Sequence, residues 1–508
     1  MIIDKSKIKT LDIKKPLQLE SGQVLDSFTI AYETFGTLNQ NKDNAILVFH
    51  ALSGDQFATG INPITGKDGW WVTAIGPNKA VDTNKYFIIC ANVLGGCMGT
   101  SGPTSINPKT KEFYCNTFPL VTIKDMVNAQ VLLLDHFQIE KTLAVLGGSM
   151  GGMQVLDGFT IAYETFGTLN QNKDNAILVF HALSGDQFAT GTNPITGKDG
   201  WWVTAIGPNK AVDTNKYFII CANVLGGCMG TSGPTSINPK TKEFYCNTFP
   251  LVTIKDMVNA QVLLLDHFKI EKTLAVLGGS MGGMQVLQFC SSYPDRTYSA
   301  IPIACTASHS AQNIAFNELS RQAIMADPEW SNGDYLKLNK NPRKGLSVAR
   351  MAGHISYLSE KGLQEKFGRK LQQTGDFKFT FDADFQVESY LKYQGNAFVD
   401  RFDANSYLYL TRAMDYFDLY RENNGVLANA FKDAKIKHCL ISFSTDWLYP
   451  TSESKKILIA LNSIGADVSF VEIITNNGHD AFLLNEPEFL RSLKGFLDSA
   501  YESFKSSH

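Results

Sequence analysis

A serine on a glycine-rich turn is the residue whose setting points most directly to chemistry. Ser280 lies in Gly-Gly-Ser-Met-Gly at 278–282, between a short apolar run and a helical pattern. In that context G-x-S-x-G predicts a strained turn that lifts a nucleophilic hydroxyl above the edge of a sheet, with the Met281 N–H beside it as an oxyanion donor. A phosphate-binding loop is the alternative, but the spacing matches neither the dinucleotide pattern nor the P-loop.

A nucleophilic serine needs a base, and the base needs an acid that orients it. Candidates follow in the chain order Ser, Asp, His: Asp446 comes after the apolar run 438–443, and His479 after the run 468–474. Both therefore lie past the C-terminal ends of predicted strands, where open α/β sheets place their sites. His354 is the one competing histidine, and we expect it to pack in a helical region. The trio predicts an enzyme that works through an acyl-serine.

The chain contains a long internal repeat. Residues 25–155 recur as 156–286 with three differences. The differing pairs are Ser27 and Gly158, Ile61 and Thr192, and Gln138 and Lys269. Solenoid repeats run about 20–50 residues and number three or more, so we interpret this block as a tandem duplication. Removing one copy leaves 377 residues. An assembly or cloning artefact is an alternative origin.

The repeat supplies a duplicate nucleophile, Ser149. The predicted helix after Ser280 continues to Tyr293, whereas the matching helix after Ser149 is cut at the seam, and the first copy has no later Asp or His of its own. Ser280 is therefore the predicted nucleophile. Only the first copy is preceded by residues 1–24, and docking of this segment on the second copy is a further possibility.

The elements that must position these residues alternate between strand and helix. Strands are expected at 159–163, 176–183, 217–225, 273–277, 300–304, 438–443 and 468–474, and helices at 254–268, 313–326 and 486–504. Thr253 and Asp256 form a capping-box pattern at the start of one helix. The alternation predicts an α/β-hydrolase fold, with a mostly parallel sheet and helices on both faces.

The expected domains follow from the repeat and from one break in the alternation. Residues 1–155 would be the N-terminal segment with a redundant first copy of the sheet half. Residues 156–327 and 436–508 would form the catalytic core, and the polar, helix-biased region 328–435 an inserted lid.

Composition excludes several classes of protein. The chain has 508 residues, 44% hydrophobic and 19% charged, with a net charge of −3, which argues against a disordered chain and against a basic nucleic-acid binder. Apolar runs are far below the roughly 20 residues that cross a bilayer, and the N-terminus has no apolar leader, so we expect a cytoplasmic protein without membrane contact. No C-x-x-C or His-x-x-x-His pattern suggests a metal site.

Many separate motifs resemble those of the homoserine O-acetyltransferase family. They lie at 181–186, 200–202, 206–208, 223–228, 231–238, 278–284, 293–295 and 478–482. The resemblance covers essentially the whole chain once one copy is removed. It implies that Ser280 takes an acetyl group from acetyl-CoA and passes it to the homoserine hydroxyl, in methionine biosynthesis. His479 would be the base, and Asp446 would hold its tautomer. Acetyl-CoA would be a co-substrate with no bound cofactor, and the protein would be a homodimer.

The resemblance also assigns roles around the serine. The N–H groups of Leu183 and Met281 would form the oxyanion hole. Arg321 would bind the homoserine carboxylate, and Asp480 its ammonium. The alternatives are a solvated helix charge for Arg321 and a capping or surface role for Asp480. Relatives that use succinyl-CoA carry Arg two residues after the catalytic Asp. Leu448 stands there in this chain and offers no partner to a carboxylate, which favours acetyl transfer.

Three other functions remain open at this point. A homoserine O-succinyltransferase would use the same triad with another acyl donor. A serine esterase would admit water to the acyl-serine, and the sequence does not show water exclusion. A non-functional duplicated chain is the third alternative.

Overall fold

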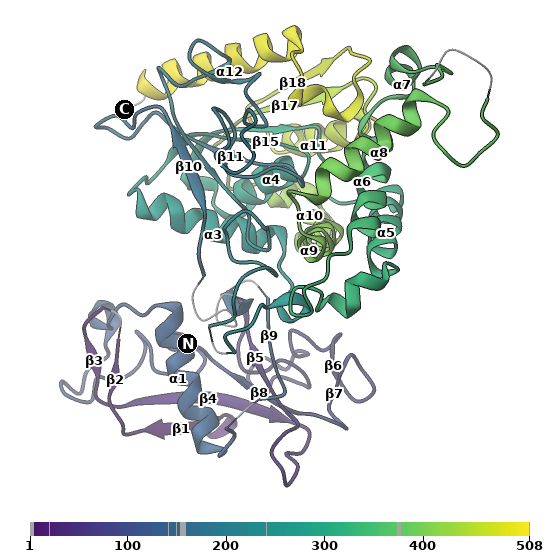
Figure 1. Cartoon of the computed structure of the whole chain (residues 1–508). Coiled ribbons are helices and arrows are strands. Elements are labelled where there is room, and N and C mark those ends of the chain that lie inside the picture. The colour runs from purple at the N-terminus through teal and green to yellow at the C-terminus, as the bar shows by residue number, and fades with distance from the viewer. Residues whose placement is uncertain are drawn as a thin grey trace. The chain divides into compact units, whose positions relative to one another are not determined.

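The computed structural model describes residues 5–19, 21–140, 142–148, 150–152, 159–239, 241–372 and 377–506. The chain divides into two compact units, which we call unit 1 (Met1–Phe159) and unit 2 (Thr160–His508) (Figure 1). Within the described ranges, every helix is too short or too polar to cross a membrane.

Unit 2 is built on a seven-stranded sheet. The strand order is β10-β14-β11-β15-β16-β17-β18, with β10 antiparallel to β14 and each other neighbouring pair parallel. The strands are β10 (Tyr163–Phe166), β11 (Ala176–Phe180), β14 (Phe218–Ala222), β15 (Thr273–Gly279), β16 (Thr297–Ile303), β17 (Lys437–Phe443) and β18 (Val468–Ile473). β11, β14 and β15 are continuous runs of buried residues, as expected for strands covered on both faces.

Helices cover both faces of this sheet, which confirms the predicted fold class. On one face, Phe489, Leu493 and Leu497 of α12 (Pro487–Ser506) pack into the main hydrophobic cluster. On the other, α3 (Ile254–His267) and α4 (Met281–Ser292) contact each other and α4 lies against β15 and β16. α3 begins at the predicted capping box, in which the Thr253 hydroxyl accepts the Asp256 N–H and the Asp256 carboxylate accepts the Thr253 N–H.

The helix-biased region between β16 and β17 is helical. After α5 (Ala311–Met325), the chain forms further helices before it returns to the sheet. They are α6 (Arg343–Tyr357), α7 (Glu360–Lys366), α8 (Gln386–Val399), α9 (Ala404–Tyr416) and α10 (Leu419–Glu422). α11 (Thr451–Ser463) then lies between β17 and β18 in the chain. That the inserted helices act as a lid stays a prediction.

Unit 1 repeats the first half of this architecture. Its sheet has the order β1-β4-β8-β5-β9. The elements are β1 (Lys9–Ile13), β4 (Phe28–Phe35), β5 (Ala45–Phe49), β8 (Phe87–Ala91), α1 (Ile123–His136) and β9 (Ala144–Gly147), with short strands β2 (Leu17–Gln18) and β3 (Val24–Leu25) forming a hairpin. Segments of identical sequence therefore form the same elements in both units, such as α1 and α3. The short pairs β6 (Ile75–Gly76) with β7 (Val81–Asp82), and β12 (Ile206–Gly207) with β13 (Val212–Asp213), repeat in the same way.

One repeated run forms a complete strand in unit 1 but not in unit 2. Phe-Thr-Ile-Ala-Tyr at 28–32 forms the start of β4 and pairs antiparallel with β1. The same five residues at 159–163 were expected to form a strand, but β10 begins only at Tyr163, so the prediction is wrong for 159–162. A strand needs a partner, and among the described residues β1 supplies one only in unit 1. Ile30 is consequently 1% exposed, whereas the matching Ile161 is half-buried.

Candidate active site

The strained turn predicted at Ser280 is present. β15 ends at Gly279, α4 begins at Met281, and Ser280 between them has φ 60° and ψ −125°. This positive φ is costly for a residue with a side chain and persists only where the surroundings enforce it. Here the Ser280 N–H donates to the Ile303 carbonyl oxygen at 3.0 Å, which ties the turn to β16.

The glycines around Ser280 are required by close packing. A Cβ on Gly282 would collide with the carbonyl oxygen of Phe180 on β11. A Cβ on Gly279 would lie 2.6 Å from the ring of Phe482. The G-x-S-x-G spacing therefore lets the turn sit directly on a neighbouring strand and beside the loop that carries His479.

Asp446 and His479 come together as the sequence predicts for strand-end residues. They follow β17 and β18, and His479 Nδ1 lies 2.8 Å from Asp446 Oδ2. Asp446 is 4% exposed and His479 3%. The other carboxylate oxygen of Asp446 accepts the N–H groups of Leu448 at 3.0 Å and Tyr449 at 2.9 Å. The carboxylate is thus fixed so that it can orient the imidazole.

The surroundings of His479 favour its charged form. Burial by itself lowers the pKa of the imidazole, but the charge and hydrogen bond of Asp446, with the charge of Asp480, outweigh it and leave the pKa above the ordinary 6.5. The ring packs against Tyr449 at 5.2 Å between centroids and against Tyr357 at 6.0 Å. An imidazole that takes up a proton readily and is held in place suits a general base.

A small cavity of about 40 Å³ adjoins the serine. Its lining includes Ser280, Leu183, Leu448 and Tyr449. Met281, the other predicted oxyanion donor, is buried as the first residue of α4, where N–H groups lack helical partners. His479 is not among the residues that line this cavity, but Tyr357 and Tyr449, which do line it, contact the His479 ring. A Ser280–His479 hydrogen bond is not among those that the described residues form, and such contacts often tighten only when substrate binds.

The turn that carries Leu183 is held by a buried histidine. Burial lowers the pKa of His181 to about 4, so the ring is neutral near pH 7. Its Nε2 accepts the Val224 N–H at 3.1 Å, and its backbone carbonyl accepts from the Gln285 side chain of α4 at 3.4 Å. These contacts link the Leu183 turn to the helix after Ser280. In the sequence, the signal for this role of His181 was its position at a strand end, in a His-Ala-Leu-Ser-Gly run that occurs twice.

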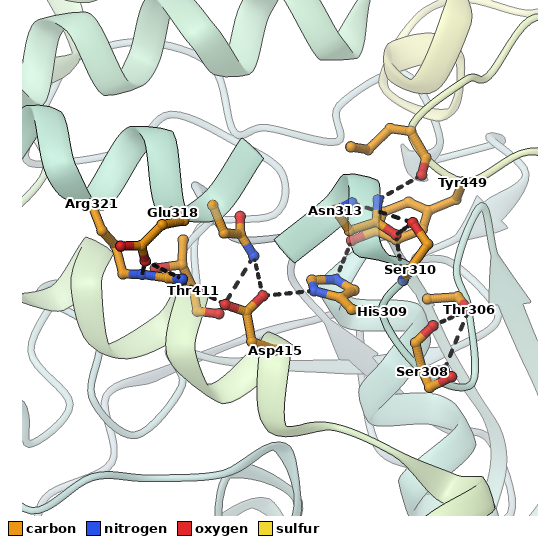
Figure 2. Close-up of polar contacts among 12 residues, drawn as sticks. Thr306, Ser308, His309, Ser310, Asn313, Glu318, Arg321, Thr411, Asp415 and Tyr449 are labelled. Carbon is orange, nitrogen blue, oxygen red and sulfur yellow. Dashed lines mark hydrogen bonds and ion pairs between the residues drawn. The ribbon is translucent and has the colours of Figure 1, made fainter. Parts of the chain in front are cut away.

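Arg321 is buried and paired with carboxylates of the protein. It is 3% exposed, so it is not a solvated helix charge. Its guanidinium contacts two carboxylates, Glu318 at 2.9 Å and Asp415 at 2.7 Å (Figure 2). Its charge is therefore already matched within the protein.

Arg350 is a cation that the sequence reasoning missed. Burial raises the pKa of Asp480, which is half-buried beside His479, and the charges of His479 and Arg350 oppose that rise. Arg350 on α6 lies with its guanidinium carbon 4.7 Å from the Phe398 ring centroid and 5.6 Å from that of Tyr357, and its Nε has no hydrogen-bond partner among the described groups. The sequence offered one signal for Arg350. No acidic residue lies within one helical turn of Arg350, whereas Glu318 lies three residues before Arg321.

Ser149 and His354 are the remaining predicted positions. Ser149 lies outside the described residues. His354 is buried in α6, and its Nδ1 lies 3.1 Å from the Tyr390 hydroxyl. No group of three or more His, Cys, Asp or Glu side chains in the described ranges is arranged to hold a metal ion.

Comparisons with known proteins agree with this geometry. Residues 44–156 and 175–486 match the family model of the alpha/beta hydrolase fold. The homoserine O-acetyltransferase of Pelagibacter ubique is 66% identical over 348 residues, which cover 68% of this chain and 94% of the relative. That of Mesorhizobium japonicum is 58% identical over 365 residues, 72% of this chain and 92% of the relative.

Solved structures give the same result. The crystal structure of homoserine O-acetyltransferase from Bacillus anthracis aligns with a TM-score of 0.62 at 28% identity, covering 66% of this chain and 92% of that one. Esterase E22 aligns with a TM-score of 0.61 at 30% identity, over 67% and 94%. The fold and the Asp–His pair beside a strained serine define an enzyme of the α/β-hydrolase superfamily. Within it, the chain belongs to the homoserine O-acetyltransferase family.

Proposed function

We propose that this protein transfers an acetyl group from acetyl-CoA to the hydroxyl of homoserine, as a step of methionine biosynthesis. The observation that carries the proposal is the buried Asp446–His479 pair in the same unit as the strained Ser280. The names of the relatives supply the substrate. Catalysis would use Ser280, and not Ser149, because Asp446 and His479 belong to unit 2.

The reaction would run in two half-reactions on one serine. His479 takes the Ser280 proton while Oγ attacks the thioester carbonyl, and the proton then goes to the departing CoA thiolate. The homoserine hydroxyl next loses its proton to His479 and attacks the acetyl-serine, and the proton returns to Ser280. The N–H groups of Leu183 and Met281 would stabilise both oxyanions, and losing one such donor typically costs about 100–1000-fold in rate.

Two arginines are candidates for the homoserine carboxylate. Arg321 was the expected one, but its two carboxylate partners oppose the binding of a third. The charge of Arg350 lowers the pKa of Asp480, the expected partner of the ammonium group, and among the described residues no ion pair joins Arg350 to a carboxylate. A substrate that carries both an ammonium and a carboxylate group fits the Asp480–Arg350 pair better, so we favour Arg350.

Acetyl is the proposed acyl group because of Leu448. This residue lines the Ser280 cavity, and its backbone carbonyl accepts from Asn313 at 2.8 Å, so its position is fixed. An apolar side chain there leaves a succinyl carboxylate without a partner, and burying an unpaired charge is costly. Succinyl transfer is the weaker alternative.

Mass spectrometry after exposure to acetyl-CoA tests the proposal. The two nucleophile candidates fall in different tryptic peptides, 142–173 and 273–296. We expect an acetyl group on 273–296 that disappears when homoserine is added, with O-acetylhomoserine as the product. Ser280→Ala should abolish labelling, and Ser149→Ala, as the matched control, should not.

Two outcomes would contradict the proposal. Loss of the acetyl group without homoserine would identify an esterase, the activity for which the structural relative E22 is named. Labelling of 142–173 instead would place the chemistry in unit 1. We further propose that the repeat arose by tandem duplication, that the protein is cytoplasmic, and that it forms a homodimer as the family resemblance implies.

A further inference from the structure

A second Asp–His pair lies beside the Ser280 cavity. His309, in the loop between β16 and α5, has Nδ1 3.0 Å from Asp415 Oδ1 and Nε2 2.9 Å from the Tyr449 hydroxyl (Figure 2). Its side chain is 1% exposed, and that of Asp415 is 5%. None of these three residues belongs to the triad, yet His309 and Tyr449 both line the cavity that contains Ser280.

The hydrogen bonds that run from Tyr449 through His309 to Asp415 have a preferred direction. Asp415 also accepts from Asn317 at 2.7 Å and pairs with Arg321, and burial, which alone would raise its pKa, is outweighed by these partners and His309, so the pKa is lowered. An ionised Asp415 accepts from His309 Nδ1–H, which leaves Nε2 as an acceptor. Burial raises the pKa of Tyr449 well above its usual value, so its hydroxyl stays protonated and donates to Nε2.

Tyr449 connects this series of hydrogen bonds to Asp446 and His479 of the triad. Its N–H donates to Asp446 Oδ1 at 2.9 Å, and its ring packs on His479 at 5.2 Å. A shift of Tyr449 would therefore disturb both the orientation of the Asp446 carboxylate and the face on which the His479 ring rests. The Tyr449 side chain is held in place by the hydrogen bond from its hydroxyl to His309 Nε2.

We propose that His309 and Asp415 are positioning residues, which fix Tyr449 and through it the Asp446–His479 pair for attack by Ser280. The proposal rests on the acyl-serine chemistry proposed above, and not on the identity of the acceptor. Among the described residues there are therefore two Asp–His pairs: Asp446–His479 transfers protons, and Asp415–His309 keeps Asp446–His479 in position.

The burst of p-nitrophenol from p-nitrophenyl acetate tests this on the full chain, because it reports acylation of Ser280 whatever the acceptor. We expect His309→Ala to lower the burst rate constant about 10–100-fold, because misplacement by about 1 Å can cost that much. The ester concentration at half-maximal rate should change less than about threefold. Tyr449→Phe, which keeps the ring and removes the hydroxyl, should lower the rate constant about tenfold.

A double-variant cycle separates positioning from general destabilisation. If both residues act through one hydrogen bond, His309→Ala with Tyr449→Phe should be within about twofold of His309→Ala alone. His438 is the matched control, since it is another buried histidine, on β17, whose ring nitrogens have no hydrogen-bond partner among the described groups. His438→Ala should leave the burst rate constant unchanged in the fraction of protein that folds.

The outcomes are distinct. Losses that multiply in the double variant, an unchanged rate in Tyr449→Phe, or an equal loss in His438→Ala would each overturn the positioning role. If His309→Ala does not fold, Tyr449→Phe and Asp415→Asn carry the same cycle. A normal burst in the unchanged protein without acetyl transfer to homoserine would refute the proposed function alone, whereas absence of the burst would refute both.

Discussion

Deleting residues 25–155 should raise the unfolding temperature of the catalytic unit. The deletion joins Val24 to Leu156, so that the N-terminal segment with β1 precedes Phe159–Tyr163 directly. This run is identical to Phe28–Tyr32, the partner of β1 in unit 1. We expect β1 to pair with it in the same register, because the sequences of both paired runs are unchanged and the connection between them differs from that in unit 1 only by Gly158 in place of Ser27.

The size of the expected stabilisation follows from a comparison of how far matching side chains are exposed in the two units. Phe28 and Ile30 are 4% and 1% exposed under β1, whereas Phe159 and Ile161 are half-buried. Ile8 packs so tightly against Gly99 that a Cβ there would collide with it, and at the matching Gly230 only Ala162 lies within 4 Å of that position. Leu263 is 46% exposed, while its counterpart Leu132 packs against the cluster that includes the β2–β3 hairpin.

Covering three half-exposed side chains is worth about 2–4 kcal/mol, since full burial of one contributes roughly 1.5–3 kcal/mol. The shortened chain has 377 residues. With an unfolding entropy of roughly 2.1 cal/mol/K per residue, it should melt about 3–5 °C higher than the unit-2 transition of the full chain.

Calorimetry measures both transitions, and hydrogen exchange at the Ile161 amide reports the new pairing. A second shortened chain that lacks residues 1–155 is the matched control, and it should melt with the unit-2 transition of the full chain. An unchanged midpoint, or an Ile161 amide that exchanges as fast as in the full chain, would refute the reasoning.

Three further predictions concern the active site. Asp446→Asn removes the charge that raises the pKa of His479, so the acidic limb of kcat/KM should move to lower pH, and a limb that stays in place would assign it to another group. Leu448→Arg should raise the ratio of succinyl to acetyl transfer about tenfold or more, because the arginine would pair with a succinyl carboxylate that is otherwise buried without a partner. Initial rates with the two CoA esters would measure this ratio. Arg350→Lys should raise the homoserine KM about tenfold with little change in the burst of Ser280 acylation, whereas Arg321→Lys should change that KM less; the reverse order would restore Arg321 as the carboxylate partner.

The Asp446–His479 pair also has a definite effect on stability. Because the pKa of His479 is raised above 6.5 in the folded protein, its contribution is fully present below about pH 6.5 and is lost as the pH rises through the raised value. Urea titrations of the full chain at pH 6 and pH 9 would measure this, and Asp446→Asn should remove the difference due to this pair.

Local patterns predicted most elements because local physics determines them. Thr253 and Asp256 cap α3 with side chains three residues apart, and the apolar run at β11 is as fully buried in unit 2 as its repeat β5 is in unit 1. The prediction failed at 159–162, because an edge strand is defined by its partner, and the partner lies elsewhere in the chain.

The active site divides in the same way. The sequence alone determined the glycine-flanked Ser280, the strand-end placement of Asp446 and His479 and their order, since steric demand and chain connectivity are local properties. Only the tertiary structure decided which charges meet. It pairs Arg321 with Glu318 and Asp415, brings Arg350 toward Asp480, and sets His309 against Tyr449, because Coulomb and hydrogen-bond energies depend on distances that folding alone sets.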